Sequence, residues 1–267
     1  MQKEAIKFEK SLIFEGMTSI RAILRGNDYG LNDRQIINIL YDQDRMNKIH
    51  KDVGYLKAVS EKYSFTVEAA DSDYLESITL GNSHGGLVAT TKERTIPSYS
   101  SLFSGSKFKR DGFYCIIEGI EDPYNFGYAI RSLYACGCDG IILGERNWMS
   151  AAGVVARSSA GASEMINIYK GINSNCIDAF KEHGYQVVCA EEKTDYILGE
   201  TELNLPLLLL VGGEKRGISN SIIKKADKLV KIEYAREFRA SLSAASAATM
   251  FAYEIMRQNA KIKNADF

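Results

Sequence analysis

The spacing of apolar residues predicts a small α/β unit in the first hundred residues. "SLIFEGMTSIRAILRG" holds an amphipathic segment that ends at Gly26, and "NKIHKDVGYLKAVSEKY" and "SDYLESITL" have helical spacing. Short apolar runs between them, "QIINILYD", "SFTVEAA" and "GGLVATTKERT", are typical of strands. The next stretch, "IPSYSSLFSGSKFKRDG", is rich in Ser and Gly and has no periodic apolar face, so it is the best candidate for a domain boundary.

From Gly112 onward, apolar strand candidates alternate with helical stretches. The strand candidates are "FYCIIEGI", "DGIILG", "MINIYK", "YQVVCAEE", "LPLLLLVGGE" and "KLVKIEY". The nearly unbroken apolar run from Leu207 to Val211 suits a strand that is buried on both faces. This alternation predicts a parallel sheet covered by helices, and "SLSAASAATMFAYEIMRQ" is predicted to be a closing helix.

Composition places the chain among ordinary globular proteins. Its 267 residues are 45% hydrophobic and 25% charged, with a formal net charge of −1, so bulk charge gives no support to a nucleic-acid partner. No apolar run approaches the roughly 18 residues of a membrane span, and "MQKEAIKFEK" is too charged for a signal peptide. We therefore expect a cytoplasmic protein without a membrane partner.

Cysteine and histidine positions give no sign of a metal site. The five cysteines lack a paired CxxC spacing and are interpreted as buried thiols, although the "CGC" at Cys136 and Cys138 could be reactive. His50 and His183 fall in helical stretches and are expected at the surface. No histidine accompanies a serine or cysteine nucleophile in a familiar pattern, and spatial proximity cannot be read from the sequence.

Two loops stand where open α/β sheets hold their ligands, at the carboxyl ends of strands. In "EDPYNFGYAIRSLYACG", a polar turn directly follows an apolar strand and leads into a helix that carries Arg131. In "VGGEKRGIS", three glycines follow the most apolar strand, and glycine lets a ligand approach the backbone. This loop is neither a P-loop nor a GxGxxG fingerprint, and a plain turn remains the alternative for it.

The combination of these loops resembles the SpoU (TrmH-like) RNA 2′-O-ribose methyltransferases of the SPOUT superfamily. "DPYNFGYAIRSLYACG" is similar to that family's Asp-Pro-x-Asn-x-Gly-x-x-x-Arg signature, and "LLLLVGGEKRGIS" to an apolar strand followed by Gly-x-Glu-x-x-Gly. "SLSAASAATMFAYE" is close to a Ser-Leu-Asn-x-Ser helix start, and "VVARSSAGASE" looks like the family's Ser-Ala-Gly-Ala segment. "FEGMTSIRAIL" and "GNSHGGLVA" look like the start and end of a ribosomal-protein-L30e-like domain.

The resemblance implies an α/β protein with two domains. Residues 1–105 would form the L30e-like RNA substrate-binding domain, and residues 106–267 the SPOUT methyltransferase domain, a parallel sheet with a trefoil knot. It also implies a homodimer that binds S-adenosyl-L-methionine in the knot and acts on RNA, either rRNA or tRNA, without a metal. Within the N-terminal domain and the linker, Arg21, Arg25, His84 and "KFKR" are the expected RNA contacts, although "SKFKRDG" is equally compatible with a solvated linker.

Residue roles follow from the same resemblance. Gly212, Ile232 and Leu242 match positions that line the cofactor pocket, and Asn125, Arg131, Glu214 and Ser241 match catalytic or substrate-positioning positions. Since a guanidinium keeps its proton at neutral pH, our hypothesis is that Arg131 clamps a phosphate and stabilises the developing alkoxide. The proton would then leave through a phosphate or water.

The sequence departs from the family in "IEYAREFRASLSAAS". Ser243 replaces the usual Asn and Ala245 the usual Ser, and "EYAREFRA" stands where the family has a Pro and a Gly. Two alternatives therefore remain open: an RNA-binding protein on this scaffold that no longer transfers methyl groups, and a nucleotide-dependent α/β enzyme unrelated to RNA. The sequence does not identify the RNA or the nucleotide.

Overall fold

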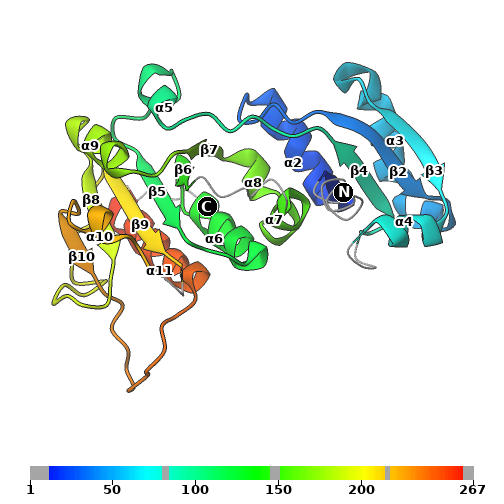
Figure 1. The fold of residues 1–267 in the computed structure, drawn as a ribbon. Coiled ribbons are helices and arrows are strands. Elements are labelled where there is room, and N and C mark those ends of the chain that lie inside the picture. The colour runs from blue at the N-terminus through cyan, green and yellow to red at the C-terminus, as the bar shows by residue number, and fades with distance from the viewer. Residues whose placement is uncertain (1–11, 80–83, 145–150, 214–216, 261–267) are drawn as a thin grey trace, which may run out of the picture. The chain divides into compact units, whose positions relative to one another are not determined.

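The structure, a computed structural model, divides the chain into two compact units (Figure 1). It describes residues 12–79, 84–144, 151–213 and 217–260. Unit 1 contains residues 1–95 and 147–165, and unit 2 contains residues 96–146 and 166–267. The functional division at residues 105 and 106 stays a prediction. Within the described ranges, no helix combines the length and apolar character needed to cross a membrane.

Unit 1 is built on a four-stranded sheet with the order β1-β4-β2-β3. Strand β4 runs antiparallel to β1 and β2, and β2 runs parallel to β3. Every strand and helix predicted for this region is present. Its elements are β1 (Ile13–Glu15), α2 (Gly16–Asp28), β2 (Ile36–Asp42), the 3-10 helix η1 (Gln43–Arg45), α3 (Met46–Tyr63), β3 (Thr66–Ala70), α4 (Ser72–Ile78) and β4 (Leu87–Thr91).

Two expectations for this region need correction. Helix α2 continues past Gly26, because the backbone N–H of Tyr29 still donates to the carbonyl of Arg25 at 3.0 Å. His84 is fully buried, and its Nδ1 accepts a hydrogen bond from the backbone N–H of Gly86 at 3.1 Å. A side chain without solvent exposure cannot serve as the surface contact that the sequence suggested.

A later segment of the chain completes the core of unit 1. Helices α7 (Ala152–Ser158) and α8 (Ala162–Met165) follow strand β6 in the sequence but belong to unit 1. Ala156 joins the apolar core formed with α2 and the sheet. Helix α7 approaches β1 so closely that a Cβ atom on Gly153 would lie 2.0 Å from the carbonyl oxygen of Ile13. Only glycine fits at such a backbone contact.

Buried charged side chains attach α8 to the rest of unit 1. The Arg34 side chain, 1% exposed, donates from Nε to Oε2 of Glu164 at 3.0 Å and lies over the ring of Phe14. Arg94 donates to the carbonyl of Ser163 at 2.8 Å, and burial lowers the pKa of its guanidinium. The side-chain amide of Asn32 donates to the Glu164 carbonyl at 2.8 Å. The hydrogen bonds to Glu164 reach across more than a hundred residues of sequence and satisfy charges that would be costly to bury alone.

Unit 2 is a six-stranded sheet with the order β10-β8-β9-β5-β6-β7, and every neighbouring pair is parallel. All the strands predicted from the apolar runs are present. The elements are α5 (Ser100–Ser104), β5 (Phe113–Glu118), α6 (Pro123–Ala135), β6 (Gly140–Leu143), β7 (Asn167–Lys170), α9 (Ser174–Glu182), β8 (Gln186–Ala190), β9 (Leu207–Gly212), α10 (Asn220–Ile223), β10 (Lys228–Val230) and α11 (Ala244–Asn259).

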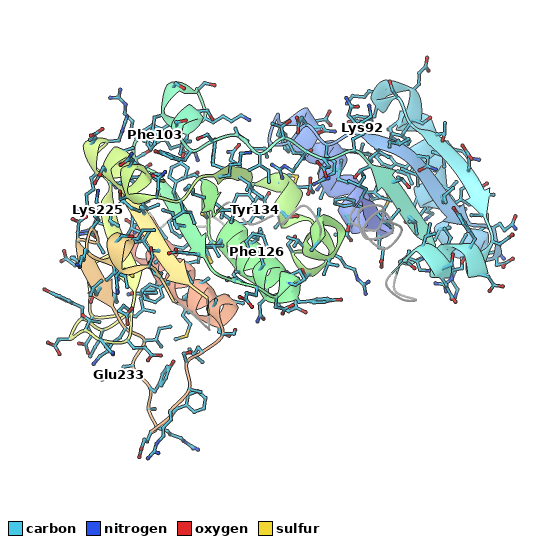
Figure 2. All side chains as sticks on the ribbon, in the orientation of Figure 1. Lys92, Phe103, Phe126, Tyr134, Lys225 and Glu233 are labelled. Carbon is cyan, nitrogen blue, oxygen red and sulfur yellow. The ribbon has the colours of Figure 1, made fainter. Side chains whose placement is uncertain are left out.

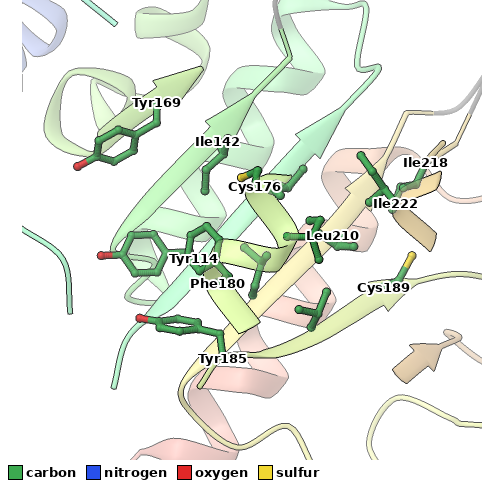
Figure 3. Close-up of a cluster of buried hydrophobic side chains, with 14 of the residues drawn as sticks. Tyr114, Ile142, Tyr169, Cys176, Phe180, Tyr185, Cys189, Leu210, Ile218 and Ile222 are labelled. Carbon is green, nitrogen blue, oxygen red and sulfur yellow. The ribbon is translucent and has the colours of Figure 1, made fainter. Parts of the chain in front are cut away.

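Alternating side chains of the central strands fill both faces of this sheet. On one face, Tyr114, Leu208 and Leu210 pack with Ile177 and Phe180 of α9 (Figure 3). The intervening positions of β5 and β9 are also buried, so the prediction of a strand buried on both faces at 207–211 is confirmed. Helices α6 and α11 pack against each other, and Thr249 Oγ1 donates to Ser132 Oγ at 2.7 Å.

The stretch chosen as the domain boundary is attached to unit 2. Leu102 belongs to the same core, and Phe103 and Phe108 pack against it. The Tyr185 hydroxyl accepts from the backbone N–H of Gly112 at 3.2 Å and donates to the carbonyl of Lys109. "SKFKRDG" therefore lies against unit 2, with the aromatic ring of "KFKR" packed on its core.

Candidate active site

Parallel pairing brings the two glycine-bearing loops together. Glu118, the last residue of β5, pairs with Gly212, the last residue of β9. The backbone N–H of Gly213 donates to the Glu118 carbonyl at 2.7 Å, and the Glu118 carboxylate accepts from the backbone N–H of Ser219 at 3.0 Å. Residues about ninety positions apart in the sequence thus form one site at the carboxyl edge of the sheet.

The first loop works as a helix start. Asp122 caps α6 by accepting from the backbone N–H groups of Tyr124 and Asn125, both at 3.2 Å, and Pro123 takes the first helical position. Aspartate satisfies the free amides of a helix start, and proline has no amide to satisfy there. The Asp-Pro-x-Asn pattern therefore fixes where α6 begins, and with it where Asn125 and Arg131 project.

The second loop closes on its own backbone. The N–H of Gly217 donates to the carbonyl of Gly213 at 2.9 Å. A Cβ atom on Gly213 would lie 2.1 Å from the carbonyl oxygen of Gly119, and one on Gly212 would lie 2.6 Å from the backbone of Gly217. The expected reason for glycine here was close approach of a ligand, but the contacts found are between backbone segments of the protein. Glycine is needed to bring the two loops into contact.

A cavity of about 250 Å³ opens beside this loop, between the ends of β8, β9 and β10 and the start of α11. Its apolar side includes Ile232, Leu242 and Phe251, and its charged side includes Glu191, Glu192 and Lys231. The described lining residues are Ala190, Glu191, Glu192, Val211, Gly212, Gly213, Gly217, Ile218, Val230, Lys231, Ile232, Tyr234, Ser241, Leu242, Ala244, Ala247 and Phe251.

The structure groups only some of the predicted site residues. Gly212, Ile232, Leu242 and Ser241 all line the cavity. Asn125 and Arg131 lie on α6 and are not among its described lining residues. At about 100° per residue they project roughly 120° apart around α6, so one face of the helix does not carry both. Glu214 lies outside the described residues, as does the rest of 214–216.

Sequence reasoning missed Tyr234, Glu191 and Glu192. Tyr234 lines the cavity, and its hydroxyl accepts a hydrogen bond from the backbone N–H of Leu242 at 3.1 Å. Tyr234 lies in "EYAREFRA", where the sequence departs from the family pattern, and that departure could have marked it as a site residue. The two glutamates directly follow β8, and the carboxyl end of that strand could have marked them.

The departures at Ser243 and Ala245 lie beside the cavity rather than in it. The Ser243 side chain caps α11 by accepting from the backbone N–H of Ser246 at 3.2 Å. Serine and asparagine are both good residues for this position, so the exchange preserves the cap. Ala245 is 7% exposed, and neither residue is among the described residues that line the cavity.

Thiol chemistry does not fit the site. Cys138 is buried and Cys136 half-buried, and burial raises the pKa of both thiols. Burial, together with nearby Glu191 and Glu118, raises the pKa of Cys189 at the sheet edge to about 12. Since the thiolate is the reactive form, these cysteines are poor nucleophiles at neutral pH. Across the described residues, no group of three or more His, Cys, Asp or Glu side chains is arranged to hold a metal ion.

Comparison with known proteins relates most of the chain to RNA methyltransferases. The SpoU rRNA Methylase family matches residues 112–253. YacO of Bacillus subtilis (strain 168), assigned to the TrmH family of tRNA/rRNA methyltransferases, is 26% identical over 241 residues, which cover 87% of this chain and 96% of YacO. A TrmH-family relative from Staphylococcus haemolyticus (strain JCSC1435) is 31% identical over 183 residues, 67% of this chain and 72% of that protein.

A solved structure extends the likeness to the whole chain. The AdoMet-bound rRNA methyltransferase from Sinorhizobium meliloti has a TM-score of 0.76 and 20% sequence identity, and the match covers 97% of each chain. At that identity the comparison concerns the fold. The α/β fold with its parallel sheet is therefore shared with a methyltransferase of known structure.

Proposed function

The chain belongs to the SpoU rRNA methylase family, and we propose that it transfers a methyl group from S-adenosylmethionine to a ribose 2′-hydroxyl of rRNA or tRNA. The observation that carries this proposal is the cavity at the carboxyl edge of the sheet. All three residues matched to the family's cofactor pocket, Gly212, Ile232 and Leu242, line it.

The residues of the cavity fit this cofactor. Ile232, Leu242 and Phe251 offer apolar contact to the adenosine, and the backbone of Gly212 and Gly213 offers hydrogen bonds. Carboxylates at Glu191 and Glu192 suit positive charge, and Lys231 suits a carboxylate. When bound, S-adenosylmethionine supplies an electrophilic methyl group on a sulfonium centre.

On the substrate side, the chain orients the ribose and stabilises charge. Arg131 is exposed on α6, and its guanidinium acts as a cation that holds a phosphate and the oxygen that loses its proton. Ser241, at the cavity, orients the ribose by a hydrogen bond, and Asn125, in the first turn of α6 on a different face from Arg131, hydrogen-bonds another part of the RNA. The proton leaves through a phosphate or water. Orientation supplies much of the rate increase that a protein can give such a transfer.

The proposal includes a homodimer formed through α6 and α11. These packed helices expose large apolar side chains at Tyr128, Met250, Tyr253 and Met256. Exposed apolar clusters of this kind mark protein interfaces. Arg131 follows Tyr128 by three positions, on the same side of α6, so a second copy on this face would receive Arg131 beside its own cavity. This arrangement explains why Arg131 is not among the lining residues of its own chain's cavity.

The proposal also includes the trefoil knot over residues 212–256 and an RNA-binding role for the N-terminal α/β region. Membership of the SpoU family is the ground for proposing the knot. Exposed Arg21 and Arg25 on α2 support the second role. The path of the chain in an experimental structure would test the first, and RNA binding by the Arg21→Ala and Arg25→Ala variants would test the second.

The central test combines cofactor binding with product analysis. Calorimetry should detect binding of S-adenosylmethionine, and mass spectrometry should find a 2′-O-methyl nucleoside after incubation with RNA from cells that lack the gene. Arg131→Ala should abolish transfer and leave cofactor affinity nearly unchanged. A folded protein that binds neither S-adenosylmethionine nor its demethylated product would overturn the proposal and favour RNA binding without methyl transfer.

Mixed dimers test the assignment of Arg131 to the partner's site. Arg131→Ala and Leu242→Glu should each be inactive alone. If Arg131 serves the neighbouring cavity, mixed dimers contain one site with both residues intact, and activity should return on mixing. If Arg131 serves its own cavity, the mixture should stay inactive.

A further inference from the structure

Residues 233–240, which we call the arm, form an exposed connection between β10 and α11. The arm contains neither helix nor strand, and residues 235–240 are all exposed. In Figure 1 it is the orange segment that extends away from the sheet of unit 2, and Figure 2 draws its side chains around the labelled Glu233.

An aromatic pair links the arm to the cavity. Tyr234 lines the cavity and is fixed by the hydrogen bond that its hydroxyl accepts from the Leu242 backbone. The Phe238 ring packs edge-on against Tyr234, with ring centroids 5.9 Å apart, yet 58% of Phe238 remains exposed. A phenylalanine held in this way presents an aromatic face to solvent at an unfavourable hydration cost. Such exposure is expected where the ring receives a partner.

A second cavity of about 230 Å³ adjoins the first. It is bounded by Phe238, Arg239 and Ala240 of the arm and shares Lys231, Ile232, Tyr234 and Glu192 with the larger cavity. The second cavity therefore continues the proposed cofactor site toward the arm. A substrate that reaches the methyl group from this side passes Phe238 and Arg239.

The arm carries no net charge, since Arg236 and Arg239 are balanced by Glu233 and Glu237, so its two arginine side chains, and not its overall charge, suit an anionic partner. The Arg239 side chain is 92% exposed, and Arg236 is also exposed. Glu237 lies 3.4 Å from Arg239, but at this exposure the pair contributes little and is easily exchanged for another anion. Arginines beside an exposed aromatic ring are typical of surfaces that stack a base and hold its phosphate.

We propose that the arm binds single-stranded RNA next to the methylated nucleotide, with a base stacked on Phe238 and the flanking phosphates held by Arg236 and Arg239. This inference rests on the proposed function, because it places the RNA at the entrance of the cofactor cavity. It assigns the arm to substrate recognition, apart from the residues that perform methyl transfer.

The test measures RNA and cofactor binding by the full-length protein separately. The probe is a short fluorescent single-stranded RNA of mixed sequence, followed by anisotropy, and S-adenosylmethionine binding is followed by calorimetry. Phe238→Ala should weaken RNA binding about tenfold, a loss typical of one stacked base, and leave cofactor affinity unchanged. Phe238→Tyr keeps the ring and should restore most of the RNA affinity.

Charge variants supply the matched control. Arg236→Gln and Arg239→Gln should each weaken RNA binding and reduce the slope of log affinity against log salt by about 0.7, the value for one phosphate contact on a single strand. Glu237→Gln removes a negative charge instead of a positive one, so it should leave the RNA affinity equal or higher.

Unchanged RNA affinity in Phe238→Ala would overturn the inference, and two further measurements then say what Phe238 does instead. If cofactor affinity is lost, Phe238 covers the cofactor. If the variant sediments as a monomer, the arm contacts a second copy of the chain. A wild-type protein that does not bind S-adenosylmethionine contradicts the proposed function instead, and the RNA measurements are read independently of it.

Discussion

Two of the connections between elements of unit 2 differ in the solvent exposure of the charged side chains around them. The connection from β6 to β7 carries α7 and α8, which belong to unit 1, where Arg34 and Arg94 meet Glu164 at less than a tenth of their full exposure. The connection from β10 to α11 carries the arm, whose arginines remain in solvent. In the described part of the first connection, buried contacts of Ala156 and Glu164 hold the helices, whereas the second connection is attached at its base through Tyr234.

This difference separates residues that stabilise from residues that recognise. A buried ion pair is costly to break, because removing one partner leaves the other charge unpaired in a poor solvent. Replacing a solvated arginine changes the free energy of unfolding very little, so such an arginine can serve binding without a cost to stability. Glu164 of the first connection and Glu237 of the second each meet an arginine, and burial decides which role the pair has.

The largest expected effect is therefore on Glu164. Glu164→Gln leaves Arg34 and Arg94 with one neutral partner in a buried site, and we expect the free energy of unfolding to fall by about 3 to 5 kcal/mol. Urea denaturation followed by circular dichroism measures this loss, and hydrogen exchange locates it in α7 and α8.

Glu254→Gln is the matched control for that prediction. Glu254 pairs with Arg257 within α11. The Glu254 side chain is 11% exposed but that of Arg257 is 55% exposed, so water still reaches the pair and we expect a loss of about 0.5 kcal/mol. Equal losses in the two variants would contradict the difference in burial on which the comparison depends.

A smaller effect is expected at Gly153. Gly153→Ala would place Cβ 2.0 Å from the carbonyl oxygen of Ile13, and α7 must shift away from β1. We expect a loss of about 1 to 3 kcal/mol, as for overpacked cores. Gly54→Ala is the control, because Gly54 lies in α3 with no atom within 4 Å of the added Cβ. That variant should gain about 0.8 kcal/mol from helix propensity, and a similar loss in both would show that α7 is not held against β1.

The next effect depends on pH. Hydrogen bonds from Arg257 lower the pKa of the Glu254 carboxyl, despite a smaller opposing effect of burial. A carboxyl whose folded-state pKa is lowered stabilises the protein above its unfolded pKa and loses that contribution as the pH falls through the folded pKa. The stability difference between wild type and Glu254→Gln should therefore be full at pH 7, begin to fall near the ordinary glutamate pKa of about 4.3, and vanish only below the lowered folded-state pKa of Glu254. A difference that does not change with pH would show that Glu254 acts through packing.

The smallest effect on stability is expected in the arm. Arg239→Gln should change the free energy of unfolding by less than about 0.5 kcal/mol. Trypsin should nevertheless cut the folded protein at Arg236 or Arg239 before Arg157, because exposed chain without helix or strand is the preferred site of proteolysis. Arg157, inside α7, should be cut only after that helix opens. Earlier cleavage at Arg157 would reverse the order of stability proposed for the two connections.

Local patterns were sufficient to predict most elements. The apolar run Leu207–Val211 predicted a strand buried on both faces, and the small residues after Ser241 predicted the closing helix. The start of α6 at Asp122 and Pro123 is also local, because capping depends on residues within one turn, but the polar residues of this stretch predicted a turn before the helix. In each case the physical cause lies within a few positions of its effect.

Other features depend on residues far apart in the chain. The resemblance predicted that Gly212, Ile232 and Leu242 share a pocket, but the spacing of those residues did not. Parallel pairing of β5 with β9 creates the contact between Gly213 and Gly119, and no local pattern contains it. The burial of His84 likewise depends on neighbours that "GNSHGG" does not specify.

The sequence alone determined the alternation of strands and helices in this protein, because each element follows from hydrophobic periodicity and capping within a short window. That α7 and α8 complete the core of unit 1 follows from packing between distant segments, since Arg34 and Glu164 are equally polar in the sequence and become a stabilising pair only where both lose water. The role of Arg239 also depends on the fold, because Arg239 and Arg34 are the same residue type in the sequence. It stays free to meet a ligand because the fold leaves it in solvent, where an ion pair is weak and a phosphate can replace it.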